Sequence, residues 1–199
     1  GAEIVAPVES LDYLDSEVAA ERLEERRFSR EPWVNDDTRL VRADTLLDAD
    51  TTYEIGGKRF VVHYPGKAHS DGDMAMLVEP DNVLFSGDLI FEGRIPFVGS
   101  ADTRQWLEDL KGMQTAGLTA LVPGHGPAAQ KPDEAISLTR EYLAYLREVM
   151  GSAVEDFTEF AVAYDAADWS AWEALPAFEA ANRINAYAVY LSMERESME

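Results

Sequence analysis

The chain lacks cysteine, and only three of its 199 residues are histidines. The absence of cysteine excludes disulfides and thiolate metal sites, and it leaves the redox compartment undetermined. No apolar run approaches the roughly 18 residues that a membrane-spanning helix needs, and no signal peptide is visible. We therefore expect a soluble protein, with the choice between cytoplasm and periplasm left open.

Basic residues are also scarce, at 17 against 38 acidic ones, so the formal net charge is −21. Such a surface repels nucleic acid and anionic membranes, which excludes both as expected partners, and it attracts cations. For most of these carboxylates, solubility is the more ordinary explanation. Hydrophobic residues make up 46% of the chain, which predicts a folded protein with a sizeable core.

The middle of the chain is predicted to be a sheet. Residues 51–55 and 58–64 are expected to form a hairpin, because Gly56 and Gly57 can adopt the positive φ angles of a tight turn. Apolar runs at residues 74–78, 83–86 and 118–122 predict further strands, the first two of them covered on both faces. A short strand is also expected at residues 3–6.

Helices are predicted before and after this sheet region. Residues 11–27 indicate one solvated helix, residues 28–50 a loop, and residues 102–116 a helix with Asp102 and Gln105 as a capping box. A long helix begins at Pro132, and two or three more follow Gly151. The fold class is therefore mixed α/β (α+β), with helices packed on a sheet. We divide it into residues 1–150 and a helical extension at residues 151–199.

Three polar stretches follow the predicted strands, at residues 69–73 (HSDGD), 86–88 (SGD) and 123–126 (PGHG). Loops at strand ends can direct side chains at one point. His69, Asp88 and His125 are each either a metal ligand or an ordinary loop residue. A carboxylate such as Asp88 at the end of an apolar strand is costly to bury without a cation or several donors.

Other polar and aromatic residues have simpler interpretations. His63 lies within a strand and is predicted to be structural, and the tryptophans at positions 106, 169 and 172 are predicted to pack in the core. Lys67 and Arg94 are loop cations near the three polar stretches. They are solvated or contact an anionic substrate.

The three stretches in this order, within the strings HSDGD, VLFSGD and LVPGHG, resemble the metallo-β-lactamase superfamily. The resemblance covers residues 51–150 well and the first fifty residues loosely. It implies an αββα sandwich with a binuclear site, usually of zinc, in which His69 binds the first metal, Asp88 bridges both metals and His125 binds the second. Iron and manganese also suit such ligands.

The activity that the resemblance implies is that of a metal-dependent hydrolase acting on a small-molecule substrate. A metal-bound hydroxide would attack an ester, thioester, lactam or similar bond. One alternative is a mononuclear iron dioxygenase on the same fold, because two histidines and a carboxylate also suit iron. A second alternative is a degenerate, non-catalytic interaction module.

The chain departs from the family in one respect, since it has no His-x-His-x-Asp-His cluster upstream of His63. We therefore expect the carboxy-terminal part of the fold, incomplete at its amino-terminal side and needing the missing segment for full activity. The chain is then a piece of a longer hydrolase, which we favour, or a split subunit, or the degenerate homologue. An amino-terminal fragment of the same protein, or a second chain, is expected to cover the open sheet.

Overall fold

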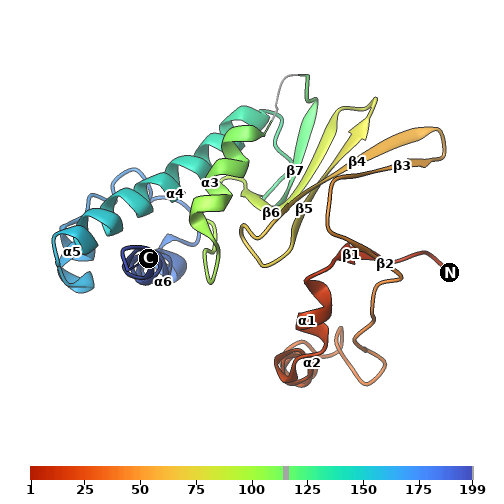
Figure 1. Cartoon of the computed structure of the whole chain (residues 1–199), viewed down its shortest axis with the longest axis horizontal. Helices are drawn as coiled ribbons and strands as arrows, with labels where there is room; N and C mark the ends of the chain where they lie inside the picture. Colours follow the sequence, from red (N-terminus) through yellow and green to blue (C-terminus); the bar gives the residue numbers. More distant parts are fainter. Residues whose placement is uncertain (114–116, 199) are drawn as a thin grey trace.

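The computed structural model describes residues 1–113 and 117–198, and its centre is a five-stranded sheet (Figure 1). The strand order is β3-β4-β5-β6-β7, with antiparallel neighbours except for the parallel pair β6 and β7. The strands are β3 (Thr51–Ile55), β4 (Lys58–Gly66), β5 (Asp73–Glu79), β6 (Val83–Phe91) and β7 (Ala120–His125). The predicted strands are all present, and β6 runs five residues further than its apolar stretch indicated.

The predicted hairpin is confirmed. Ile55 pairs with Lys58 across the turn, and Gly56 and Gly57 have φ angles of 61° and 77°. A side chain at either position would be strained, because L residues rarely adopt such angles. This turn fixes which face of the sheet each residue of β3 and β4 occupies.

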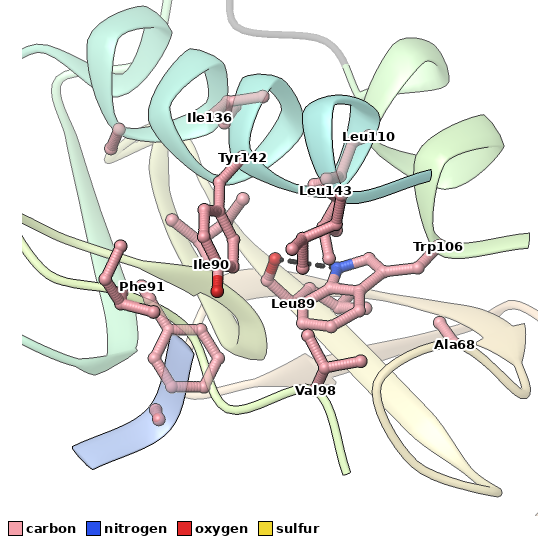
Figure 2. Close-up of a cluster of buried hydrophobic side chains, with 14 of the residues drawn as sticks. Ala68, Leu89, Ile90, Phe91, Val98, Trp106, Leu110, Ile136, Tyr142 and Leu143 are labelled. Atoms are coloured by element: carbon pink, nitrogen blue, oxygen red, sulfur yellow. Dashed lines mark hydrogen bonds between the residues drawn. The ribbon is translucent and has the colours of Figure 1, made fainter. Parts of the chain in front are cut away.

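Helices α3 (Thr103–Gly112) and α4 (Pro132–Glu155) lie on one face of the sheet. Helices α5 (Phe160–Ala166) and α6 (Phe178–Glu196) pack against α4. Figure 2 shows the resulting core, in which the indole of Trp106 is fully buried and donates to the carbonyl of Leu89 at 3.0 Å. Trp172 is buried and Trp169 partly buried against the same core, as predicted. Burial of such rings contributes a large share of the packing energy.

Helix α3 begins where the sequence indicated but ends earlier. The carboxylate of Asp102 accepts from the backbone N–H of Gln105 at 3.0 Å, which is half of the predicted capping box. The other half is absent among the described contacts, since the Gln105 side chain donates to Asp109 instead. The helix ends at Gly112, and the rest of the predicted helix, residues 114–116, lies outside the described residues.

The opposite face of the sheet carries an apolar surface without a helix over it in the described part of the chain (Figure 1). The strand register aligns side chains that alternate with the helix-facing ones. Phe85 on this face is 40% exposed, whereas its neighbour Leu84 on the other face is 7% exposed. The prediction that both strands are covered on both faces is therefore wrong for β6 at Phe85, whereas β5 has no exposed residue on either face. We name as the open face the residues on this side that are not buried, which are Phe60, Met76, Val83, Phe85 and Val122, whereas Val62 and Val78 on the same side are buried.

The first fifty residues form a small two-stranded unit beside the sheet, which Tyr64 contacts through the carboxylate of Glu9. A parallel pair joins β1 (Val5–Pro7) to β2 (Thr45–Leu47), and the second of these strands was not predicted. The single predicted helix is instead two, α1 (Ser10–Leu14) and α2 (Glu17–Ser29). The break occurs because the hydroxyl of Ser16 accepts from the N–H of Ala19, as an N-cap does.

Helix α6 is attached to the rest of the fold through buried polar contacts as well as through the core. The side chain of Asn185 on α6 accepts from the N–H of Val98 at 2.9 Å and donates to the carbonyl of Pro96 at 2.7 Å. It also donates to the hydroxyl of Tyr142 on α4 at 3.0 Å. A fully buried amide with all of these partners fixes the loop between β6 and α3 against α4 and α6. No helix in the described chain is long and apolar enough to cross a membrane.

Candidate metal centre

His69 lies in the loop between β4 and β5. Within this loop the carboxylate of Asp73 accepts from the N–H and the hydroxyl of Ser70, at 2.7 and 2.9 Å. The Nδ1 atom of His69 lies 3.9 Å from the same carboxylate, and its side chain is 17% exposed. The backbone N–H of Asp102 donates to the carbonyl of Ala68 at 2.8 Å. The imidazole is thus presented from a loop that is held at both ends.

Asp88 reaches its position because a glycine faces it on the next strand. A Cβ atom on Gly124 would lie only 1.8 Å from the Oδ1 atom of Asp88 and 2.8 Å from its backbone nitrogen. Real side chains cannot approach so closely, so only glycine at position 124 permits this placement of the carboxylate. The Asp88 side chain remains 36% exposed and is therefore open to a ligand.

His125 lies at the end of β7, directly beside this carboxylate. Its Nε2 atom is 3.7 Å from Oδ1 of Asp88, beyond the range of a hydrogen bond. Its carbonyl accepts from the N–H of Glu92 at 2.9 Å. Gly126 follows with a φ of 105°, and a Cβ there would lie 2.3 Å from the Glu92 carbonyl oxygen. The glycines on both sides of His125 therefore allow the chain to pass close to Asp88 and Glu92.

One aromatic ring joins the two histidines. The ring of Phe91 stacks on that of His125 with centroids 5.1 Å apart, and it lies 5.8 Å from that of His69. His69 also contacts Trp106 edge-on, with centroids 5.2 Å apart. Sequence reasoning missed Phe91. The apolar residues that follow Asp88 were a signal that the strand continues and places a side chain between the two loops.

His69 and His125 therefore both contact Phe91, and Asp88 is adjacent to His125. A metal ion also requires a complete set of donors, which for zinc is usually four. Among residues 1–113 and 117–198, no group of three or more histidine, cysteine, aspartate or glutamate side chains is close enough to hold a metal ion. Asp88 and His125 thus fit a metal as a pair of donors, and the described residues do not complete the set.

The remaining candidates lie outside this arrangement. The Nδ1 atom of His63 is 3.0 Å from the carboxylate of Asp50 at the surface, consistent with a structural role. The ammonium group of Lys67 lies 3.1 Å from Asp71. The Nε atom of Arg94 is buried without a hydrogen-bond partner among the described residues. Burial raises the pKa of the nearby Glu92 carboxyl.

Comparison with known proteins identifies the family. The model of the metallo-beta-lactamase superfamily matches residues 14–125, which is more than half of the chain. The chain belongs to the metallo-beta-lactamase superfamily. This match includes all three candidate ligands, and it ends at His125.

Individual members of the superfamily share a low sequence identity with this chain. A metallo-beta-lactamase type 2 from Elizabethkingia meningoseptica is 28% identical over 89 residues, which are 42% of this chain and 36% of that protein. The chain thus spans about a third of the length of this curated relative.

Solved structures of the superfamily share the fold. A metallo-beta-lactamase family protein from Thermus thermophilus is 18% identical, with a TM-score of 0.58 over 78% of this chain and 57% of that one. An archaeal superfamily protein from Sulfolobus tokodaii is 20% identical, with a TM-score of 0.50 over 73% of this chain and 58% of that one. The predicted metallo-β-lactamase fold is confirmed.

Proposed function

We propose that this chain is part of a metal-dependent hydrolase whose metal centre includes His69, Asp88 and His125 as ligands. The observation that supports the proposal most directly is the approach of Asp88 to His125, which requires glycine at position 124. A carboxylate and an imidazole 3.7 Å apart, without a hydrogen bond between them, can both contact one cation.

Zinc is the metal that we propose, as two ions in the complete protein, with iron or manganese as alternatives. When bound, the metal supplies a Lewis acid and a water of lowered pKa, which together suit attack on an ester, thioester, lactam or similar bond. This chain would hold its part of the centre in place through Phe91, which packs between the two imidazoles. Rings fixed in this way need little rearrangement when the metal binds.

We further propose that the remaining ligands come from a segment that covers the open face. This segment is an amino-terminal portion of the same protein or a second chain. Contiguous apolar surface that includes Phe85 and Met76 is expected to be covered in solution, because its exposure to water is unfavourable. A layer packed on this face would give the second half of a sandwich.

Zinc titration of the chain tests the ligands. We expect His125→Ala and Asp88→Asn each to weaken zinc binding at least about tenfold, since each removes one of few donors. His63→Ala is the matched control, because it removes an exposed histidine whose one partner among residues 1–113 and 117–198 is Asp50. Equal weakening by His63→Ala, or binding unchanged in His125→Ala, would remove His125 from the centre.

Metal analysis and native mass spectrometry of the purified protein test the rest. Two zinc ions per complete protein agree with the hydrolase, whereas one iron would favour the dioxygenase. A co-purifying fragment, or association of the 199-residue chain with itself, agrees with a covered open face. A compact, cooperatively folding monomer would contradict the proposed cover.

A further inference from the structure

A hollow lies between α6, the loop before His69, and the segment from Val98 to Arg104. It consists of two adjoining cavities of about 360 and 350 Å³, and both are lined by Lys67 and Arg195. We name it the α6 cleft. Such volumes are at the lower end of the range for small-molecule sites, about 300–1,000 Å³.

The cleft brings together three cationic side chains in a protein that has few of them. Lys67, Arg104 and Arg195 come from three separate elements, although the chain as a whole carries a net charge of −21. Such a gathering is unexpected for a surface that is otherwise acidic. It produces a local attraction for anions where the rest of the surface repels them.

The two carboxylates in the same walls are already engaged. The carboxylate of Glu196 accepts hydrogen bonds from both terminal guanidinium nitrogens of Arg147, at 2.7 and 3.0 Å, and it also forms an ion pair with Arg104. Two arginines around one carboxylate leave this group of three with a positive charge. The carboxylate of Asp102 accepts from the N–H of Gln105, as the cap of α3.

Lys67 and Arg195 are available to a ligand. Among the described residues, Lys67 is paired only with Asp71, and both side chains are more than half exposed, so an incoming anion can replace this weak contact. Arg195 forms no ion pair with any described residue. Both cations line the cleft, one from the loop before His69 and one from α6.

The cleft also adjoins the candidate metal centre. Lys67 is two residues before His69, and the hydrogen bond from Asp102 to Ala68 connects the wall of the cleft to the same loop. We propose that the α6 cleft binds an oxyanion, a carboxylate or a phosphate group, that is carried by the substrate. This inference rests on the proposed hydrolase function and adds the class of substrate, an anionic one.

Anion binding to the metal-free chain tests this proposal without any turnover. Inorganic phosphate and succinate are titrated separately at low ionic strength, with binding followed by NMR shifts of backbone amides. We expect saturable shifts at residues 98–104 and 188–196, and about tenfold weaker binding in Arg195→Gln and in Lys67→Gln, because each loses a charge-assisted contact. Tighter binding of phosphate indicates a phosphorylated substrate, and tighter binding of succinate a carboxylic acid.

Lys131→Gln is the control, since Lys131 is an exposed lysine next to the start of α4 that is paired with Glu134. Its anion affinity should stay within about twofold of the unsubstituted chain, because a distant surface charge is largely screened. Absence of saturable binding, or equal loss in all three variants, overturns the proposal. Because the titration needs no metal, its failure is distinct from that of the proposed function, which zinc binding tests separately.

Discussion

The two faces of the central sheet differ although β5 and β6 carry apolar side chains on both of them. Leu84 and Phe85 are adjacent on β6, yet Leu84 packs in the core beneath the helices and Phe85 is 40% exposed on the open face. Alternation along a strand sends neighbours to opposite faces, so their burial depends on what lies across from each face. An apolar strand therefore predicts that other residues pack on both of its faces. Only the tertiary structure shows whether the described residues do so.

The largest effect is expected from truncating these two neighbours in turn. Leu84→Ala should lower the free energy of unfolding by about 2–5 kcal/mol, since it leaves a cavity in a packed core. Phe85→Ala should cost less than about 1 kcal/mol in the isolated chain, because its ring is only half-buried. Urea unfolding followed by circular dichroism measures both values.

The same pair of variants also tests whether the open face is covered in solution. Repeating the measurement over a range of protein concentrations separates burial within one chain from burial between chains. If Phe85→Ala costs as much as Leu84→Ala and the loss depends on concentration, a second copy covers this face. Equal costs without any concentration dependence would contradict the exposed position of Phe85.

The covered side is also stabilised by an ionic contact, which should have a pH signature. Hydrogen bonds from Arg147 are the main cause that lowers the pKa of Glu196 to about 2 from an ordinary value of 4.5. Its contribution is thus present above about pH 4.5 and is lost as the pH falls toward 2. Glu196→Gln should cost on the order of 2–3 kcal/mol at pH 7, and much less near pH 2.

Stability curves of Glu196→Gln and the unsubstituted chain, measured by chemical unfolding between about pH 2 and pH 7, check this expectation. Glu141→Gln, which changes an exposed carboxylate on the outer side of α4, is the control and should show little effect. A constant difference across the pH range would mean that the carboxylate of Glu196 is not the source of the stabilisation.

A smaller loss of stability is expected on the edge strand β7, which carries His125 of the candidate metal centre. Gly124→Ala should cost about 1–3 kcal/mol, because the new methyl group displaces the carboxylate of Asp88. Gly112→Ala, at the end of α3, has open space around its Cβ and should be neutral or slightly stabilising. Thermal unfolding of both variants measures the contrast, and equal effects would contradict the close approach at Gly124.

The smallest effect on stability is expected in the amino-terminal unit, whose residues are not part of the five-stranded sheet. Ser16→Ala removes the cap of α2 and should cost about 1 kcal/mol locally. Hydrogen exchange should show faster amides in α2 and unchanged amides in β5 and β6. Faster exchange throughout the sheet would show that this unit and the sheet unfold together.

Much of the fold could be predicted from local patterns. The glycine pair at positions 56 and 57 determined the hairpin, and Pro132 and Asp102 marked the starts of two helices. Weak patterns failed, as at β2, which has three residues, and at the break between α1 and α2, which depends on one capping hydroxyl. Short elements are decided by a few contacts rather than by a repeating pattern.

The candidate site was predictable in part for a similar reason. The sequence by itself predicted that His69, Asp88 and His125 lie where strands end. The structure places His69 just after β4 and His125 at the end of β7, but Asp88 lies within β6, which continues to Phe91. The sequence also determined that a glycine precedes His125, whereas the approach of this glycine to Asp88 depends on how β6 and β7 are aligned. It did not indicate the role of Phe91, because the contacts of this ring at the end of β6 with His125 on β7 and with His69 depend on how these separate segments are aligned.

Only the tertiary structure decided which apolar side chains are covered, and where the cationic ones gather. Helices α3 and α4 pack on one face and leave the other open, while α6 places Arg195 beside Lys67, more than a hundred residues away in sequence. The physical reason is that local sequence sets backbone conformation and the periodicity of side chains. Contacts between distant segments depend instead on the packing of whole elements, which no single segment encodes.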